Sequence, residues 1–387
     1  MAHRRDWRRR RVCWVVSSPV TARAFLLNHF RELSRTCDLT LVANTADFGF
    51  LKTAGLGLPG LSVAIERPVA LGADLAALYR LSTHLRRGSF DAVHSITPKA
   101  GLLAMAAARL ARVPVRIHWF TGQVWVTRSG SRRLLLKKLD QVTATFATHL
   151  LVDSPSQMAF LASEGVAPSA KMRVLGSGSV CGVDISRFRR DVTWRTEMRC
   201  GLNVPEAATL FAFLGRCTID KGLMDLARAF NELCARRDDC YLVVAGPDED
   251  GVLPEMLQFC GSARDRVRRL DYVDATERVL AAADVLCLPS YREGFGSVIL
   301  EAAAAGAPSV GSRIYGIVDA IEDGVTGLLH EPRDPRDLCK KMLRLVEEPA
   351  LRVSLGHRAQ VRATAKFQQA MLTAALVDYY HEVIPTN

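Results

Sequence analysis

The chain has 387 residues, of which 49% are apolar and 24% charged, and its formal net charge is +11. This length exceeds what one hydrophobic core usually serves and indicates two domains. No run of about 18 apolar residues occurs, so no transmembrane helix is expected. The ten cysteines include no C-x-x-C pair and no Cys/His group with zinc spacing. This argues against a disulfide framework and a zinc centre, and favours a reducing cytoplasm.

The chain opens with a basic arm, HRRDWRRRR at residues 3–11, followed by an apolar run that turns into a loop at Pro19. The order of basic and apolar residues is that of a signal peptide. Because the apolar part is only about seven residues long, we interpret it as a first buried strand behind the arm.

Short apolar runs then alternate with helical patterns along the whole chain. In the first half they lie at residues 12–18, 38–44, 61–66, 91–96, 115–120, 149–154 and 172–176. In the second half they lie at residues 209–215, 240–246, 268–273, 284–290, 307–312 and 327–331. Apolar runs between helices are typical of parallel strands covered on both faces. The pattern predicts an α/β fold with two Rossmann-like domains.

The two series of strands are joined near residues 181–210. We therefore predict an N-terminal Rossmann-like domain at residues 1–190 and a C-terminal one at residues 191–365. The last segment, residues 366–387, has a helical pattern, and we expect it to pack back on the N-terminal domain.

The first candidate site is FLGRCTIDKG, residues 213–222, in which Arg216 and Lys221 follow an apolar run and precede a helix expected near Gly222. Glycine permits a tight turn, a helix N-terminus favours an anion, and the two cations add to this attraction. Arginine can also grip phosphate oxygens in pairs. The stretch indicates a diphosphate site, although two solvated loop cations are the alternative on this stretch alone.

The second candidate site is YREGFGSVILEAAAAG, in which Glu293 and Glu301 stand on either side of a glycine turn. Ser297 is expected to cap the helix that follows. Three backbone N–H groups are then available to an anion or a sugar hydroxyl, those of Phe295, Gly296 and Ser297. Carboxylates accept well from vicinal hydroxyls, as in ribose binding, so the stretch suits a nucleotide-sugar. The alternatives are an exposed loop charge for Glu293 and helix-dipole stabilisation for Glu301.

Together the two stretches resemble the E-x7-E signature of retaining family 4 glycosyltransferases, which have the GT-B fold. Their order, their spacing and their strand–loop–helix contexts agree with that family. GVDISRF at residues 182–188 and AIEDGVTGLLHEPRDPRDL at residues 320–338 add to the resemblance, which covers essentially the whole second domain. Cys181 departs from the pattern, because many members have asparagine before GVD.

The resemblance implies that Arg216 and Lys221 hold the donor diphosphate, that Glu293 contacts the donor sugar, and that Glu301 holds the ribose. It implies no metal and no cofactor beyond a UDP-sugar donor, and an α-linked product from an α-linked donor. Charge develops on the departing phosphate of such a donor, and cations and N–H groups near Gly296 would stabilise it.

In the first domain, residues 94–125 resemble bacterial transferases that extend undecaprenyl-diphosphate-linked sugars for capsule, O-antigen or protein glycosylation. Their donors are often UDP-N-acetylhexosamines or 6-deoxy relatives. His118 is expected to end a strand and to contact the transferred sugar, which makes it a candidate catalytic residue with Glu293, Arg216 and Lys221; a core histidine is the alternative. Two residues are candidate acceptor contacts, Lys99 at a helix start, which otherwise faces water, and Arg23 in the loop that replaces the family's glycine-rich loop.

The charge is divided unevenly along the chain. Residues 1–190 hold 28 basic and 11 acidic residues, a net +17, whereas the remainder holds 23 and 29, a net −6. TRSGSRRLLLKKLDQV, residues 127–142, places leucines between cationic pairs, as an interfacial helix does. We expect the first half to meet an anionic membrane surface, with a solvated basic face as the alternative. No helix-turn-helix, zinc finger or aromatic RNA-binding signature supports nucleic-acid binding.

The sequence therefore predicts a retaining glycosyltransferase at the inner face of the plasma membrane. It would move a sugar from a UDP-sugar to a lipid-diphosphate-linked sugar in bacterial surface polysaccharide or glycan biosynthesis. The same chemistry on a soluble or protein acceptor stays open. So do a non-catalytic nucleotide-sugar-binding protein on this fold and an epimerase, which would form product without an acceptor.

Overall fold

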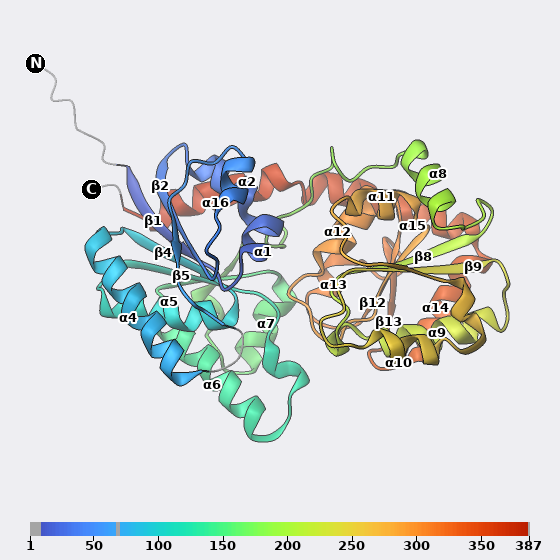
Figure 1. Ribbon diagram of the computed structural model, residues 1–387, viewed down its shortest axis with the longest axis horizontal. Helices are drawn as coiled ribbons and strands as arrows, with labels where there is room; N and C mark the ends of the chain where they lie inside the picture. The colour runs from blue at the N-terminus through green and yellow to red at the C-terminus, as the bar shows by residue number, and fades with distance from the viewer. Residues whose placement is uncertain (1–8, 67–69, 386–387) are drawn as a thin grey trace, which may run out of the picture. The chain divides into compact units, whose positions relative to one another are not determined.

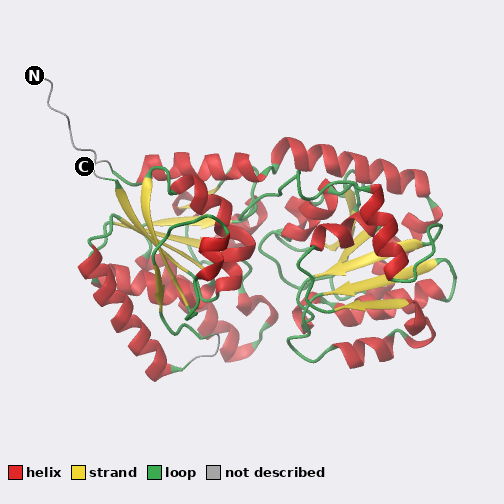
Figure 2. Ribbon diagram, turned by 45° about the horizontal axis from the view of Figure 1, so that its top comes forward, coloured by secondary structure: helices red, strands yellow, loops and turns green. Residues whose placement is uncertain are grey.

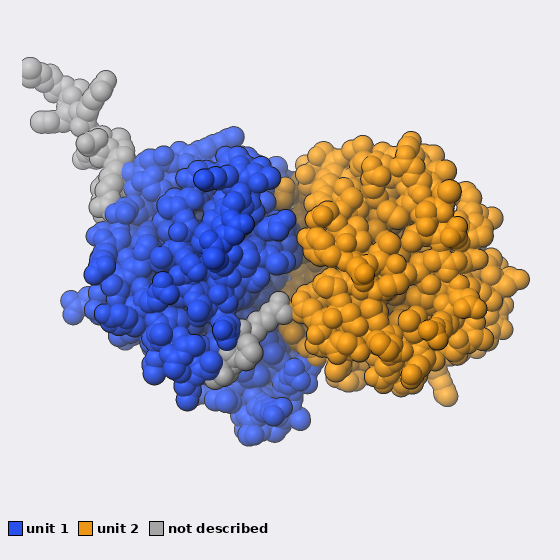
Figure 3. Space-filling model, viewed as in Figure 1, with its two compact units in different colours: residues 1–181, 370–387 blue, residues 182–369 orange. Residues whose placement is uncertain are grey.

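The computed structural model describes residues 9–66 and 70–385. The chain divides into two compact units, residues 1–181 with 370–387 and residues 182–369 (Figure 3). Each unit is a parallel sheet with helices on both faces (Figures 1 and 2), so the predicted α/β architecture with two Rossmann-like domains is confirmed. The passages between the units lie at Cys181–Gly182 and Gln369–Ala370, and not at residues 190 and 366.

The first unit contains a seven-stranded sheet within the described residues, ordered β3-β2-β1-β4-β5-β6-β7. Its strands are β1 (Arg10–Val15), β2 (Cys37–Ala43), β3 (Gly60–Ser62), β4 (Ala92–Ile96), β5 (Val115–Phe120), β6 (His149–Val152) and β7 (Met172–Val174). The order reverses between β1 and β4. Sheets of this kind bind ligands at such a switch point, beyond the carboxyl ends of the strands.

Helices cover both faces of this sheet because successive residues of a strand point to opposite sides. They are α1 (Pro19–Thr21), the π-helical turn η1 (Ala22–Leu26), α2 (Leu27–Leu33), α3 (Gly49–Thr53), α4 (Leu71–Gly88), α5 (Pro98–Leu110), η2 (Val124–Thr127), α6 (Gly130–Phe146), α7 (Pro155–Ser163), η3 (Ser169–Lys171) and α16 (Gln369–Val383). On β1, Cys13 and Val15 face the core beneath α4 to α7. Trp14 and Val16 face the core shared with α2, α3 and α16.

The C-terminal helix α16 belongs to the core of the first unit. Its Tyr380 hydroxyl lies 2.8 Å from Nδ1 of His94 on β4. Its Thr373 hydroxyl lies 2.9 Å from Nδ1 of His29, whose Nε2 lies 2.8 Å from the Val180 carbonyl oxygen. One buried histidine thus contacts both segments that adjoin the passages between the units.

The second unit contains a six-stranded parallel sheet within the described residues, ordered β10-β9-β8-β11-β12-β13. Its strands are β8 (Thr209–Leu214), β9 (Cys240–Ala245), β10 (Val267–Leu270), β11 (Val285–Leu288), β12 (Ser309–Ser312) and β13 (Gly327–His330). Its helices are α8 (Val192–Gly201), η4 (Ile219–Lys221), α9 (Leu223–Cys234), α10 (Leu253–Phe259), η5 (Gly261–Arg266), α11 (Thr276–Ala282), α12 (Ser297–Ala304), α13 (Ile317–Ala320), α14 (Pro335–Glu347) and α15 (Pro349–Lys366). The order reverses between β8 and β11, which is the switch point of this sheet.

Across residues 9–66 and 70–385, no helix is both long and apolar enough to cross a bilayer. Over the same residues, no group of three or more His, Cys, Asp or Glu side chains is arranged to hold a metal ion. All ten cysteines are free thiols.

Candidate active site

The two sequence motifs meet at the switch point of the second sheet. The loop at residues 215–222 leaves β8, and the loop at residues 289–296 leaves its neighbour β11. The backbone N–H of Tyr291 donates to the Asp220 carbonyl at 2.8 Å, and Arg292 pairs with the Asp220 carboxylate at 2.7 Å. Segments far apart in the sequence therefore build one surface at the carboxyl end of the sheet.

Gly222 allows the first loop to lie directly against the second. Its φ is +71°, and a Cβ on this residue would lie 2.0 Å from the carbonyl oxygen of Pro289. Gly222 ends the short turn η4 and is the N-cap of α9. A side chain here would both strain the backbone and separate the loops.

Lys221 and Glu293 form an ion pair between the two loops, with Nζ 2.5 Å from Oε1. Their side chains are 19% and 14% exposed, and Ser290 donates its hydroxyl to the same carboxylate oxygen at 2.8 Å. Such low exposure does not fit a solvated loop cation or an exposed loop charge. The sequence indicated both residues as site residues but did not predict that they pair.

Arg216 lies on the β9 side of the site, where it pairs at 2.7 Å with Glu249 of the loop that follows β9. The arginine side chain is 44% exposed. Glu249 was not predictable from the sequence, because no local pattern connects it with Arg216. The guanidinium remains accessible to an anion that approaches the end of the sheet.

The start of α12 presents unpaired backbone donors. Gly296, with φ +77°, is the N-cap and Ser297 is the first helical residue, so the expected serine cap was wrong by one position. The left-handed backbone at the cap favours glycine there. No described residue accepts a hydrogen bond from the N–H of Phe295, Gly296 or Ser297. These donors and the positive end of the helix dipole favour an anion.

Glu301 lies one turn into α12. Burial raises the pKa of its carboxyl to about 7, while Arg187 acts to lower that pKa and Glu277 to raise it. No described residue hydrogen-bonds to its side chain. A partly buried carboxyl without a partner is poorly explained by stabilisation of the helix dipole alone, and it is available to the hydroxyl groups of a ligand.

Two further residues lie close to this site, although no sequence pattern indicated a role for them. Arg187, in the GVDISRF segment, pairs with Glu277 at 2.8 Å, donates to the Asp274 carbonyl at 2.9 Å, and influences Glu301. Ser290, which orients Glu293, was signalled only by its position directly after a strand.

The structure places His118 in the core of the first unit and not at the end of a strand. β5 continues to Phe120, the histidine is 1% exposed, and its Nδ1 lies 2.9 Å from the Ser95 hydroxyl. A Cβ on Gly101 of α5 would collide with its ring. Burial lowers the pKa of His118 to about 3, so the imidazole is neutral. The contacts therefore support the core histidine and not a residue that touches a sugar.

The candidate acceptor residues follow β1 and β4, which flank the switch point of the first sheet. Lys99 of α5 pairs with Asp74 of α4 at 2.6 Å, so it does not simply face water. Arg23 is exposed on η1. Thr97, the N-cap of α5, has a φ of +76°, which is strained for a residue other than glycine, and its hydroxyl lies 3.0 Å from that of Ser17. The acceptor roles of Lys99 and Arg23 remain predictions.

Two glycosyltransferase families match this chain and decide its class. The family described as "Glycosyl transferase 4-like domain" matches residues 21–178, and "Glycosyl transferases group 1" matches residues 208–348. The chain belongs to the GT-B glycosyltransferases of the family 4 type. The second match spans Arg216, Lys221, Glu293 and Glu301, so all four lie within the region that matches this glycosyltransferase family.

Curated relatives of this glycosyltransferase carry related names. The "Capsular polysaccharide biosynthesis glycosyltransferase CapM" of Staphylococcus aureus is 26% identical over 320 residues, which cover 82% of this chain and 84% of the relative. A "D-inositol 3-phosphate glycosyltransferase" of Arthrobacter sp. (strain FB24) is 29% identical over 332 residues, which cover 82% of this chain and 77% of the relative.

Solved structures of other glycosyltransferases have the same fold. Anabaena Alr3699/HepE in complex with UDP-glucose matches with a TM-score of 0.81 and 17% identity, over 96% of this chain and 99% of that one. WaaG, a glycosyltransferase involved in lipopolysaccharide biosynthesis, matches with a TM-score of 0.73 and 17% identity, over 95% and 99% of the two chains. At these identities the likeness concerns the fold, and the predicted GT-B architecture is confirmed.

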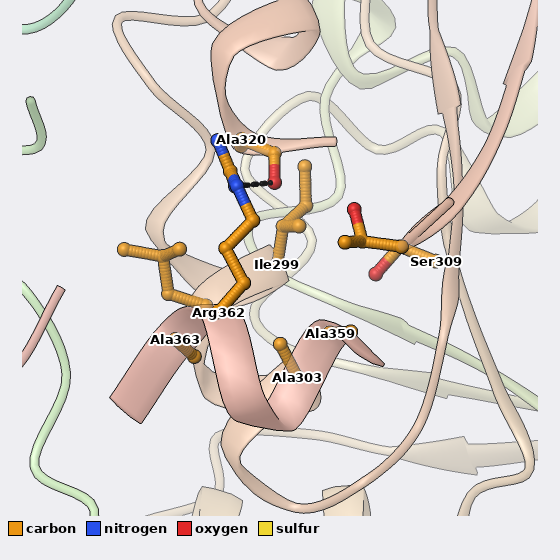
Figure 4. A pocket seen from close by; sticks show the side chains of 9 residues that line it. Ile299, Ala303, Ser309, Ala320, Ala359, Arg362 and Ala363 are labelled. Carbon is orange, nitrogen blue, oxygen red and sulfur yellow. Dashed lines mark hydrogen bonds between the residues drawn. The ribbon is translucent and has the colours of Figure 1, made fainter. Parts of the chain in front are cut away.

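Helix α15 stabilises the helices near this site in the glycosyltransferase. Arg362 donates to the carbonyl oxygen of Ala320 at the end of α13, at 2.8 Å (Figure 4). It also donates to the carbonyl oxygen of Asp319, at 2.7 Å. A cavity of about 10 Å³ lies beside Arg362, between α12, α13 and α15. It has room for about one water molecule and is a packing defect rather than a substrate site.

Gly222→Ala tests whether the close approach of the two loops matters. We expect a loss of at least about 2 kcal/mol of stability, from the strained φ and the contact with Pro289, together with weaker UDP binding. Gly251→Ala is the matched control, because Gly251 has φ +66° but open space around its Cβ position. Urea unfolding and UDP titration measure both effects. Equal losses in the two variants would show that backbone strain alone is responsible.

Proposed function

We propose that this glycosyltransferase moves a sugar, an N-acetylhexosamine or a 6-deoxy relative, from a UDP-sugar to a lipid-diphosphate-linked sugar, with retention of the anomeric configuration. The product would enter bacterial surface polysaccharide or glycan biosynthesis. The observation that carries the proposal is the meeting of two loops at one switch point, which joins Lys221, Glu293 and the free N–H groups at the start of α12. A nucleotide diphosphate sugar requires hydrogen-bond donors for its diphosphate and a hydrogen-bond acceptor for its sugar hydroxyls, and both are present in this one place.

In this proposal the bound ligand replaces the carboxylate partners in the existing ion pairs. The diphosphate accepts from Lys221 and Arg216, which releases Glu293 to accept from hydroxyls of the donor sugar. The unpartnered carboxyl of Glu301 accepts from the ribose. As the bond to the sugar breaks, negative charge grows on the departing phosphate, where the two cations and the N–H groups of Gly296 and Ser297 stabilise it.

The relatives and solved structures support a UDP-sugar donor and are compatible with two classes of acceptor. HepE was crystallised with UDP and with UDP-glucose, and CapM is named for capsular polysaccharide biosynthesis. Other relatives are named for D-inositol 3-phosphate and L-malate, which are small soluble molecules. A soluble acceptor is therefore the second candidate.

A panel of donors and acceptors tests the proposal. The donors are UDP-GlcNAc, UDP-GalNAc, UDP-glucose and 6-deoxy forms; the acceptors are undecaprenyl-diphosphate-linked sugars, D-inositol 3-phosphate and L-malate. We expect transfer only to the lipid-linked acceptor, with an α-anomeric proton signal in the product. Transfer to the small acceptors alone would select the second candidate. Product without an acceptor would indicate an epimerase, and UDP-sugar binding without transfer would indicate a binding protein.

A further inference from the structure

Helix α4 carries an apolar row on its solvent side. Leu71, Leu75 and Tyr79 follow one another at four-residue spacing, and their side chains are 78%, 66% and 74% exposed. The opposite face of α4 is buried in the core through Ala77 and Leu81. A helix with an apolar face in the core normally presents polar residues to water, so a second apolar row indicates a contact outside the unit.

A cavity of about 390 Å³ continues from this row along the second half of α4 and reaches β3. It is lined by Leu61, Tyr79, Arg80, Thr83, His84, Arg87 and Gly88, none of which is acidic. Within the described part of the chain, neither Arg80 nor Arg87 has an ion-pair or hydrogen-bond partner. The Nε2 of His84 is buried and likewise without a described partner. The lining thus offers two guanidinium groups, an imidazole nitrogen and two hydroxyls, which suit a phosphate group.

Exposed apolar and basic residues also occur on a neighbouring helix. α4, α5 and α6 pack side by side on one face of the first sheet (Figure 1). On α6, Leu134 and Leu135 are exposed, and Lys138 lies on the same side of the helix. Apolar rows beside unpaired basic residues are the pattern of a helix that lies in a membrane interface.

We propose that the α4 surface, formed by Leu71, Leu75, Tyr79, Arg80, His84 and Arg87, docks on a bilayer containing anionic phospholipid. The lipid phosphate lies at Arg80, His84 and Arg87, and the apolar row enters the interface. Charge complementarity selects this occupant, because a two-fold contact with a second copy would bring the same arginines together. The proposal goes beyond the proposed function, because it concerns a surface distant in sequence from the donor motifs and is tested without donor or acceptor.

Sedimentation with vesicles of phosphatidylcholine, with and without phosphatidylglycerol, tests the α4 surface on the full chain. Arg80→Ala/Arg87→Ala should weaken binding to the anionic vesicles about 30-fold, because each basic residue near such a surface contributes about 1 kcal/mol. Leu75→Ser/Tyr79→Ser should also weaken it. The matched control is Arg336→Ala/Lys340→Ala, which removes two exposed charges from α14 of the second unit and should bind as the unaltered chain does. Circular dichroism verifies that each variant is folded.

The vesicle and dimer measurements have three outcomes that would overturn the proposal. They are equal binding to vesicles with and without the anionic lipid, unchanged binding of Arg80→Ala/Arg87→Ala, and a dimer that Leu75→Ser/Tyr79→Ser dissociates. Stabilisation by inorganic phosphate without vesicle binding would assign the cavity to a free phosphate and also overturn it. A protein that binds vesicles through α4 but transfers no sugar would refute the proposed function and leave this inference intact.

Discussion

Lys221→Ala is expected to lower kcat/KM for sugar transfer about 1,000-fold, because the ammonium group would no longer stabilise charge on the departing phosphate. It should also destabilise the protein by about 2 kcal/mol, since Glu293 is 14% exposed and would lose its counter-ion. Initial rates with the UDP-sugar and urea unfolding measure the two effects separately.

The double variant Lys221→Ala/Glu293→Gln separates catalysis from the ion pair. Glutamine at position 293 needs no counter-ion, so stability should recover while transfer stays low. Lys341→Ala is the matched control, because its ammonium lies 3.9 Å from Asp337 on the surface of α14. Transfer by Lys221→Ala at the rate of this control would refute the assigned role.

Glu301→Gln is expected to weaken UDP binding by at least about tenfold, because a charged acceptor for hydroxyl groups becomes a neutral one. The same substitution should stabilise the free protein at alkaline pH. Burial raises the pKa of Glu301 from 4.5 to about 7. The folded chain therefore holds a proton that the unfolded chain has lost between these values, and stability falls as the pH rises through this window.

Glutamine cannot ionise, so the stability of Glu301→Gln does not fall as the pH rises through this window. We expect it to be about 1 to 2 kcal/mol more stable than the unaltered chain near pH 8, a figure reduced for the partial exposure of the site, and nearly equal to it below pH 4.5. UDP affinity of the unaltered chain should rise as the pH passes through about 7, whereas that of the variant should stay flat. Glu347→Gln, on the exposed side of α14, is the control. A pH-independent difference in stability would contradict the raised pKa.

Much of the fold was predictable because its signals are local. All thirteen apolar runs predicted as strands overlap a strand of the described residues, since each carries the β-propensity and flanking turns of a buried parallel strand. The helix starts near Gly222 and Ser297 follow from glycine and small residues after such runs. The unit boundaries were less accurate, because the chain between the sheets has no composition of its own.

The pairings within the site were not predictable. Lys221 lies 2.5 Å from Glu293, and Arg216 lies 2.7 Å from Glu249, only because neighbouring strands bring their carboxyl ends together. His118 has the sequence context of a strand end, yet β5 continues past it and α5 covers it. Whether a histidine in a strand meets solvent or a helix depends on which face it occupies and how far the strand extends.

The sequence by itself determined the two-sheet α/β architecture and the basic character of the first half. It also determined that Arg216, Lys221 and Glu293 lie in loops that follow strands, and that Glu301 lies near the start of a helix that follows such a loop. Each of these properties depends on short stretches of the chain, in which apolar periodicity, glycine and charge determine the structure of adjacent residues. The tertiary structure decided which charges compensate one another, which carboxyl is left without a partner, and which apolar side chains of α4 face water. Those outcomes depend on burial and on distances between distant segments, and only the packed sheets and helices set them.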